Sequence, residues 1–139
     1  MGTEDIIRTQ VAAFNRHDAV AFAACYAANA VVADPQSPDP LKGTEAITKD
    51  IDDWFGAFPD IETRMTRTVL NGAAYAVEWS MTGTHEGPLV TPDGHIPATG
   101  KPVRINVATI GRTDAAGRIV EERRYYDLSS VMSQLGLIQ

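Results

Sequence analysis

The sequence predicts an α+β fold, in which three N-terminal helices pack on a strongly curved, mostly antiparallel sheet. Two observations lead to this prediction. Apolar residues recur at helical spacing as far as Phe58, and from Asp60 onward they alternate with a period of two. The chain has 139 residues, of which 44% are hydrophobic and 22% charged, so we expect one domain that spans residues 1–139.

Three helices are expected before the sheet, each with an apolar stripe along one face. Thr3 and Asp18 are suitable N-caps for the first two of them. The predicted helices are Glu4–Arg16, Ala19–Tyr26 and Thr44–Ala57. Between the second and the third, Val31–Asp34 predicts a short strand, and the prolines of Pro35–Pro40 predict a loop.

Four long strands and a short helix are expected after the third helix. The predicted strands are Ile61–Leu70, Ala73–His85, Val103–Arg112 and Arg118–Asp127, and the helix is Leu128–Leu135. Asn71-Gly72 is typical of a tight hairpin turn between the first two strands. Glu86–Pro102 is rich in proline and glycine, which predicts a long loop of the kind that often forms a lid or a rim.

The strand Arg118–Asp127 carries the main candidate for chemistry. Alternation places Arg123, Tyr125 and Asp127 on the same face as Ile119. This face is not uniformly apolar, which favours the wall of a small-molecule pocket over a plain core. Asp127 is either a pocket carboxylate or the N-cap of the following helix, and the spacing leaves both interpretations open.

Composition excludes several classes of partner. The net charge of −6 argues against binding to nucleic acid or to an anionic membrane surface. We see no signal peptide and no stretch near the roughly 18 apolar residues that span a bilayer. The single cysteine, Cys25, lies in an apolar run, which predicts a core residue and a reducing, cytoplasmic setting.

No cofactor is expected. The histidines His17, His85 and His95 are far apart in the sequence and match no template for a metal site. The phosphate-binding and nucleophile motifs GxGxxG, GxxxxGK[ST] and GxSxG are also missing from the sequence. Acid/base chemistry without a cofactor and simple ligand binding are the two interpretations that this leaves.

Asp127 and His85 are the predicted catalytic pair. A carboxylate buried beside aromatic residues has a raised pKa, which suits a general acid or base near neutral pH. An imidazole opposite it could donate to a developing enolate oxygen, although His85 could equally be a plain turn residue. The predicted substrate-binding residues are Trp54, Phe58, Trp79, Met81, Asn106, Arg123, Tyr125 and Asp34. For Trp54 and Phe58, simple packing in the core is the competing interpretation.

Short stretches along most of the chain resemble the SnoaL-like polyketide cyclase family, within the NTF2-like superfamily. They include Phe14–Asp18, Gly43–Ile47, Gly83–Pro88, Tyr125–Asp127 and Gln134–Gly136. The resemblance implies an NTF2-like cone of helices wrapped by a curved mixed sheet, and usually a homodimer through the sheet. It also implies ring closure of an anthracycline-type antibiotic precursor by intramolecular aldol condensation, without metal or cofactor. In those cyclases an Asp on the last strand is the acid/base residue, and Asp127 is the matching position.

Relatives with this fold also hydroxylate polyketides, hydrate or open epoxides, isomerise steroids, or only bind ligands. The set of one Arg and two Asp that epoxide hydrolases of this fold use is not recognised in the sequence. The leading prediction is a cofactor-independent polyketide cyclase with a small hydrophobic or aromatic polyketide-like ligand. The alternatives are a related hydroxylase, hydratase or isomerase, and a non-catalytic binding protein.

Overall fold

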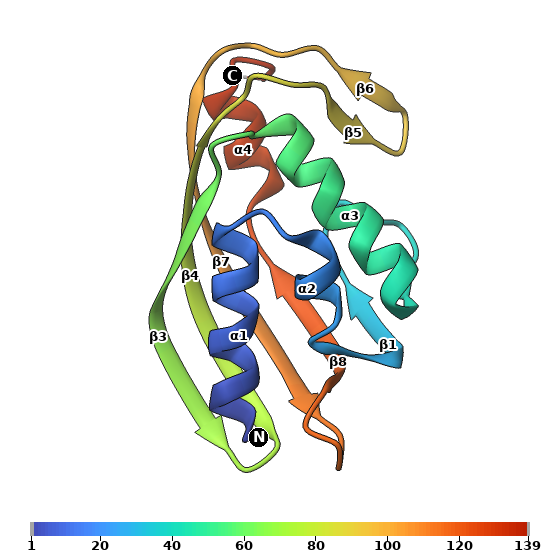
Figure 1. The fold of residues 1–139 in the computed structure, drawn as a ribbon. Coiled ribbons are helices and arrows are strands. Elements are labelled where there is room, and N and C mark those ends of the chain that lie inside the picture. The colour runs from blue at the N-terminus through green and yellow to red at the C-terminus, as the bar shows by residue number, and fades with distance from the viewer. Residues whose placement is uncertain (1, 139) are drawn as a thin grey trace.

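A computed structural model describes residues 2–138 of the chain. The helices in this part are α1 (Thr3–Asn15), α2 (Ala19–Ala23), α3 (Gly43–Ala57) and α4 (Leu128–Gln134). The strands are β1 (Tyr26–Ala33), β2 (Leu41–Lys42), β3 (Glu62–Asn71), β4 (Ala74–Thr84), β5 (Leu89–Thr91), β6 (Gly94–Ile96), β7 (Pro102–Thr113) and β8 (Ile119–Tyr125). Figure 1 shows α1, α2 and α3 in front of one face of the main sheet, with β3 and β4 bending around α1.

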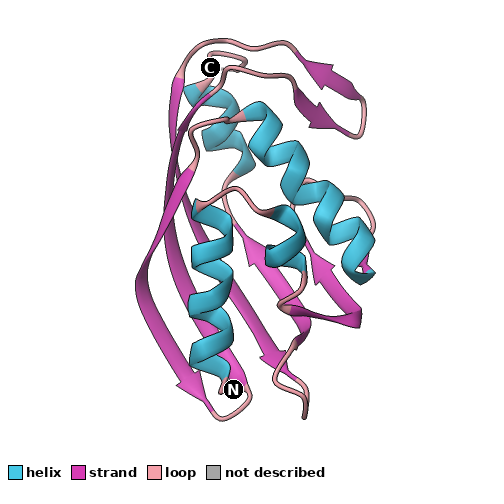
Figure 2. Cartoon of the chain, in the orientation of Figure 1, coloured by secondary structure: helices cyan, strands magenta, loops and turns pink. Residues whose placement is uncertain are grey.

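Within residues 2–138, the main sheet has six strands in the order β2-β1-β8-β7-β4-β3. β1 runs parallel to β8, and the other neighbouring strands run antiparallel. Figure 2 shows the two layers, helices on one side and the bent sheet on the other. The predicted α+β fold with N-terminal helices on a curved, mostly antiparallel sheet is confirmed.

The first helix forms where its apolar stripe predicts it. Ile6, Ile7 and Phe14 are buried against the sheet. The predicted N-cap is wrong by one residue, since Gly2 is the N-cap and Thr3 already belongs to the helix. At the other end, the side-chain amide of Asn15 exchanges two hydrogen bonds with the backbone of Thr63, at 2.8 and 2.9 Å, and this fixes α1 against β3.

The second helix is much shorter than predicted. Asp18 caps it as expected, because its Oδ1 accepts from the Ala21 amide at 2.9 Å. The helix ends at Ala23, and the chain from Tyr26 onward is the strand β1. Alanine favours a helix locally, but pairing of β1 with the central strand β8 satisfies the same backbone groups and overrides that preference.

The segment predicted as a long loop contains a second, small sheet. β5 and β6 pair antiparallel as a hairpin. This hairpin lies beside α3 in Figure 1 and is joined to the proline-rich loop by a 2.6 Å hydrogen bond from Gln36 Nε2 to the Val90 carbonyl. In the described part of the chain, no helix has the length and apolar character needed to cross a membrane.

A β-bulge in β8 decides which of its side chains face the helices. Arg112 of β7 pairs with Glu121, and the next residue, Thr113, pairs with Ile119, so Val120 is the extra residue. Ile119 and Glu122 are therefore both buried although an even alternation would separate them. The predicted inner face of residues 121–127 is wrong for this reason, because a shift of one residue exchanges the two faces of a strand.

Candidate functional site

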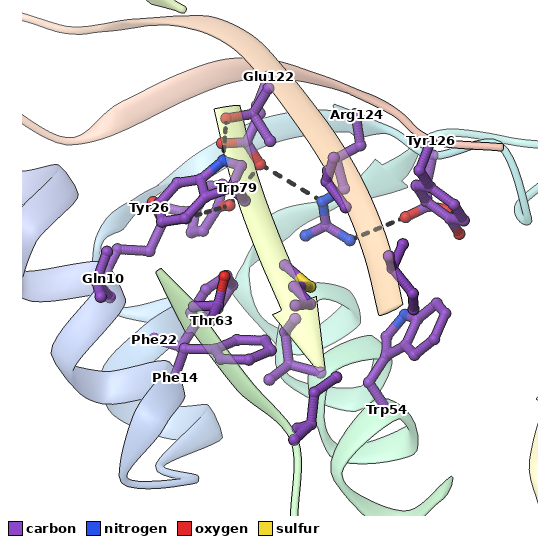
Figure 3. Close-up of a pocket in the computed structure, with 18 residues that line it drawn as sticks. Gln10, Phe14, Phe22, Tyr26, Trp54, Thr63, Trp79, Glu122, Arg124 and Tyr126 are labelled. Carbon is purple, nitrogen blue, oxygen red and sulfur yellow. Dashed lines mark hydrogen bonds and ion pairs between the residues drawn. The ribbon is translucent and has the colours of Figure 1, made fainter. Parts of the chain in front are cut away.

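A cavity of about 70 Å³ lies between the helices and the concave face of the sheet (Figure 3). Most of its wall is apolar, from Val11, Phe14, Phe22, Ile51, Trp54, Ile61, Trp79, Met81, Ile105 and Val107. Polar side chains complete the wall, namely Gln10, Tyr26, Asp34, Thr63, Thr109, Glu122, Arg124 and Tyr126. An apolar pocket with a few converging polar groups is the usual form of a small-molecule site.

Glu122 is the carboxylate that lies deepest in this wall. Its residue is 2% exposed, and both of its oxygens accept hydrogen bonds from phenols. Tyr26 donates to Oε2 at 2.6 Å, and Tyr75 donates to Oε1 at 2.7 Å. Burial, followed by the charge of Glu122, raises the pKa of each tyrosine, so both phenols stay protonated donors at any physiological pH.

Arg124 connects Glu122 to two aspartates. Its Nε lies 3.5 Å from Glu122 Oε2. Its Nη1 donates to Asp34 Oδ2 at 3.1 Å and to Asp50 Oδ2 at 2.7 Å. Tyr126 donates to the other oxygen of Asp34 at 2.8 Å. The structure therefore brings together one Arg and two Asp, a set that the sequence analysis did not recognise.

Charge in this cluster is unbalanced, because three carboxylates of the described residues surround a single guanidinium. Burial alone would lower the pKa of Arg124, but the neighbouring anions, Asp50 first among them, hold it well above its usual value. Burial raises the pKa of Asp50 in spite of the opposing effect of Arg124. Burial thus favours the neutral form of the Asp50 carboxyl group.

A second hollow of about 360 Å³ lies next to the cavity, between the proline-rich loop, α3 and the β5–β6 hairpin. Trp54 lines both spaces, and Asp50 lines this outer one. The Trp54 ring stacks on Phe58, with ring centroids 5.8 Å apart, and meets the ring of Tyr126 edge-on at 6.1 Å. Trp54 therefore forms the partition between the cavity and the hollow.

Four of the predicted site residues line the cavity: Trp54, Trp79, Met81 and Asp34. Phe58 and His85 are buried but lie outside its wall. Their rings pack together with centroids 5.5 Å apart. His85 Nδ1 accepts from the Thr99 amide at 3.2 Å, and burial lowers the pKa of its imidazole. The expected meeting of His85 with Asp127 in one cavity is wrong.

The other predicted residues lie on the outside of the protein. Asn106, Arg123, Tyr125 and Asp127 are all exposed. Asp127 Oδ1 accepts from the Ser130 amide at 3.1 Å and so caps α4. Its expected place in the cavity is wrong, because the bulge in β8 turns the opposite face of the strand inward.

The sequence pattern did not reveal the residues of the polar cluster. Buried charges carry no periodic signal in a sequence, since Glu, Arg and Asp normally mark the solvent face. Glu122, Arg124 and Tyr126 do share a parity, and β8 has a paired strand on each of its edges, so one of its two faces has to lie against the helices. Charged residues on both faces of a central strand are the one signal that could have indicated a buried polar site.

Two other kinds of reactive group, metal ligands and the cysteine thiol, do not form a second candidate site in the described part of the chain. In residues 2–138, no three His, Cys, Asp or Glu side chains gather as a set of metal ligands. Cys25 is buried, and burial raises the pKa of its thiol to about 11, so the nucleophilic thiolate is scarce at neutral pH.

Comparison with known proteins gives consistent results. A model of the family described as SnoaL-like polyketide cyclase matches residues 4–135. The structure of IdmH from Streptomyces antibioticus, a candidate polyketide cyclase, shares 26% identity over 96% of this chain and 98% of that chain, with a TM-score of 0.76. No curated protein matches the sequence.

Two further structures share the fold. A protein with a ketosteroid isomerase-like fold from Catenulispora acidiphila, solved with trimethylamine, is 23% identical over 96% of this chain and 93% of that one, with a TM-score of 0.78. SalBIII, an epoxide hydrolase/cyclase-like enzyme of pyran ring formation in salinomycin, is 18% identical over 92% of each chain, with a TM-score of 0.73. The family match covers nearly the whole chain and the solved structures share its architecture, so the protein belongs to the SnoaL-like polyketide cyclase family, with an NTF2-like fold.

Proposed function

We propose that the protein is a cofactor-independent enzyme that closes a ring in a small polycarbonyl compound by intramolecular aldol condensation. One observation carries the proposal: the apolar cavity has, at one end, a buried guanidinium shared by three carboxylates. Such a site excludes water around the reacting carbons and supplies both a base and a positive charge for a developing enolate.

Asp50 is the group that we assign as general base and acid. It lines the outer hollow and not the cavity itself, so the reacting carbon has to lie at the boundary of the two spaces, next to Arg124. Only its Oδ2 takes part in a hydrogen bond within the described residues, and its pKa is raised by burial. In contrast, the oxygens of Asp34 are held by Tyr126, Arg124 and the Gln36 amide. This assignment replaces the acid/base role expected for Asp127.

The proposed step is an isomerisation. The Asp50 carboxylate takes a proton from the carbon next to one carbonyl, and the resulting enolate carbon forms a bond to the carbon of a second carbonyl. The alkoxide that this creates takes the proton back from Asp50. Arg124 stabilises the enolate oxygen, and the aromatic wall keeps the chain folded for reaction.

Heptane-2,6-dione is a suitable probe, because its aldol closure gives 3-hydroxy-3-methylcyclohexanone. We expect the protein to speed both ring closure and exchange of the α-protons in D₂O, followed by proton NMR. Asp50→Asn should lose both activities, whereas Asp52→Asn, an exposed carboxylate on the same helix, should retain them. Loss in Asp127→Asn with full activity in Asp50→Asn would overturn the assignment.

Opening of an epoxide by water is the second candidate function. It is favoured by the bridging of Asp34 and Asp50 by a single nitrogen of Arg124, at 3.1 and 2.7 Å. One carboxylate would take a proton from water as the water oxygen attacks an epoxide carbon, and the other carboxyl group would protonate the oxygen that leaves. Cyclohexene oxide in H₂¹⁸O should then give a diol with one labelled oxygen at a rate above that without protein, and an unchanged rate would exclude this function for that probe.

The outer face of the sheet supports a proposal of homodimerisation. Ile110 pairs with Ala76 in β4 and with Arg123 in β8, and Ala76 also pairs with Val69 in β3. Val69 and Ile110 are exposed hydrophobic residues, as is Tyr125 close by. Light scattering after gel filtration should give twice the mass of the chain, and Ile110→Glu should give the monomer. A monomeric wild-type protein would contradict the proposal.

A further inference from the structure

The inner cavity presents carbon to its contents, although several polar residues belong to its wall. These polar groups are turned to one another. Trp79 Nε1 donates to Thr109 Oγ1 at 2.9 Å. Gln10 Nε2 donates to the Tyr26 hydroxyl at 2.7 Å, and this hydroxyl donates to Glu122 at 2.6 Å. The surface that faces the cavity is therefore almost wholly apolar, and it suits a hydrocarbon group better than a polar one.

The volume of the inner cavity limits that hydrocarbon group to a short chain. Benzene binds in a cavity of about 150 Å³ in an engineered protein. The present cavity has about 70 Å³, less than half of that volume. By the same ratio it holds roughly three carbon atoms in a row, which excludes a ring. The outer hollow, with about 360 Å³, has room for a ring.

The two spaces meet beside the buried charges. Trp54 lines both of them, and it lies one helical turn after Asp50 on α3. Arg124 lines the inner cavity and bonds to Asp50, which lines the outer hollow. In Figure 3, Trp54 and Arg124 lie on one side of the inner cavity and Phe14 lies on the other. A ligand that extends into both spaces therefore places its middle atoms next to the carboxylate and the guanidinium.

We propose that the inner cavity binds a short alkyl end of the substrate, of up to about three carbons, while the ring-forming part of the substrate lies in the outer hollow. The ketone that joins the two parts then lies next to Asp50 and Arg124. This proposal rests on the proposed function for the position of the reacting carbon. It names the substrate class as a polycarbonyl compound with a short alkyl ketone at one end. An empty apolar cavity destabilises a fold, so filling it with an alkyl group favours binding.

Phenyl alkyl ketones test the two spaces separately, because the phenyl ring is too large for the inner cavity and has to stay in the hollow. The series is acetophenone, propiophenone, butyrophenone and hexanophenone, whose alkyl groups have one, two, three and five carbons. In calorimetric titrations, the affinity should rise about fourfold for each methylene up to butyrophenone, and hexanophenone should bind no more tightly. A rise that continues to hexanophenone, or equal affinities for the four ketones, would overturn the proposal.

Two conservative substitutions in the wall on β7 should move the limit in opposite directions. Ile105→Val removes one carbon, so the affinity for valerophenone, with four alkyl carbons, should rise about fourfold relative to butyrophenone. Val107→Ile adds one carbon, so butyrophenone should bind no more tightly than propiophenone. Val20→Ile, at an exposed position of α2, is the matched control and should leave the series unchanged.

A purely structural role of Ile105 and Val107 gives a different result. Each substitution would then change the Tm and lower the affinity for every ketone by the same factor. The limit would stay at the same chain length in wild type and in both variants, and this outcome would reject the alkyl site.

The same ketones separate this proposal from the proposed function. They carry one carbonyl and cannot close a ring, but their α-protons can exchange in D₂O. A limit in chain length without faster exchange would support the alkyl site and reject the acid/base role of Asp50. Faster exchange that is lost in Asp50→Asn, without any limit in chain length, would do the reverse.

Discussion

Replacement of Glu122 by Gln is the strongest test of the buried network. The Glu122 carboxylate accepts from Tyr26 at 2.6 Å and from Tyr75 at 2.7 Å, and it lies 3.5 Å from Arg124 Nε. Gln has the same shape but carries a donor where one of the phenols also donates. One phenol is therefore left without an acceptor, and the negative charge that attracts Arg124 is removed.

The expected cost follows from these contacts. A hydrogen bond to a charged group contributes about 1.5–3 kcal/mol, and a buried phenol without an acceptor costs about 1–3 kcal/mol. Asp34 and Asp50 still compensate the charge of Arg124, so the full penalty for an isolated buried charge is avoided. We expect the free energy of unfolding to fall by about 3–5 kcal/mol, which lowers the Tm of a domain of this size by about 10–20 °C.

Urea denaturation followed by circular dichroism measures this change. Glu121→Gln is a matched control, since Glu121 is the preceding residue and makes only an exposed ion pair with Arg112 at 3.3 Å. The control should stay within about 0.5 kcal/mol of wild type. If Glu122→Gln also lies within about 1 kcal/mol of wild type, then the buried network and the bulge that turns Glu122 inward are both refuted.

Three further predictions concern stability. Gly111→Ala should cost about 1–3 kcal/mol in thermal melts, because the new Cβ would clash with the backbone carbonyl oxygen of Glu121 and lie 2.6 Å from the Tyr75 hydroxyl oxygen. Gly56→Ala in α3 meets open space and should gain about 0.5–1 kcal/mol. Asp127→Ala should cost about 1 kcal/mol through loss of the cap, while Asp127→Asn melts close to wild type; equal losses in both would argue against a capping role. Burial lowers the pKa of His85, so the unfolded chain binds its proton first as pH falls below the ordinary value of about 6.5, and stability should fall with it. The urea midpoints of wild type and of His85→Gln, measured between pH 7 and pH 5, check this prediction. The same dependence of the midpoint on pH in both proteins would contradict it.

The fold could be predicted because its signals are local and periodic. Ile6, Ile7 and Phe14 recur at helical spacing, and Tyr75, Val77 and Trp79 alternate along β4; all six are buried as expected. Asn71-Gly72 likewise marks the β3–β4 turn, where Gly72 has a φ of 61°. Where the outcome depends on a distant partner, the prediction failed: β1 is a strand because it pairs with β8, which lies about ninety residues further along the chain.

The site was only partly predictable, for a related reason. Trp54, Trp79 and Met81 line the cavity because each continues an apolar stripe that the sequence displays. Glu122 and Arg124 follow Val120, whose insertion as a bulge reverses the faces of the strand. A bulge is set by how two strands fit together and has no fixed sequence pattern. The resemblance to the family gave the fold correctly but led to Asp127, on the wrong side of that reversal.

The arrangement of the buried charges itself argues for a chemical role. A cluster of this kind adds little to stability, since burying ions is as costly as their attraction is favourable, and apolar residues of similar volume would serve the core equally well. Its members are also not equivalent. Two phenols hold Glu122, while Tyr126 and a backbone amide hold Asp34. Asp50 has Arg124 as its partner and a side chain that is 20% exposed toward the outer hollow. This difference supports our proposal that Asp50 exchanges a proton with a substrate while the other two carboxylates keep Arg124 in place.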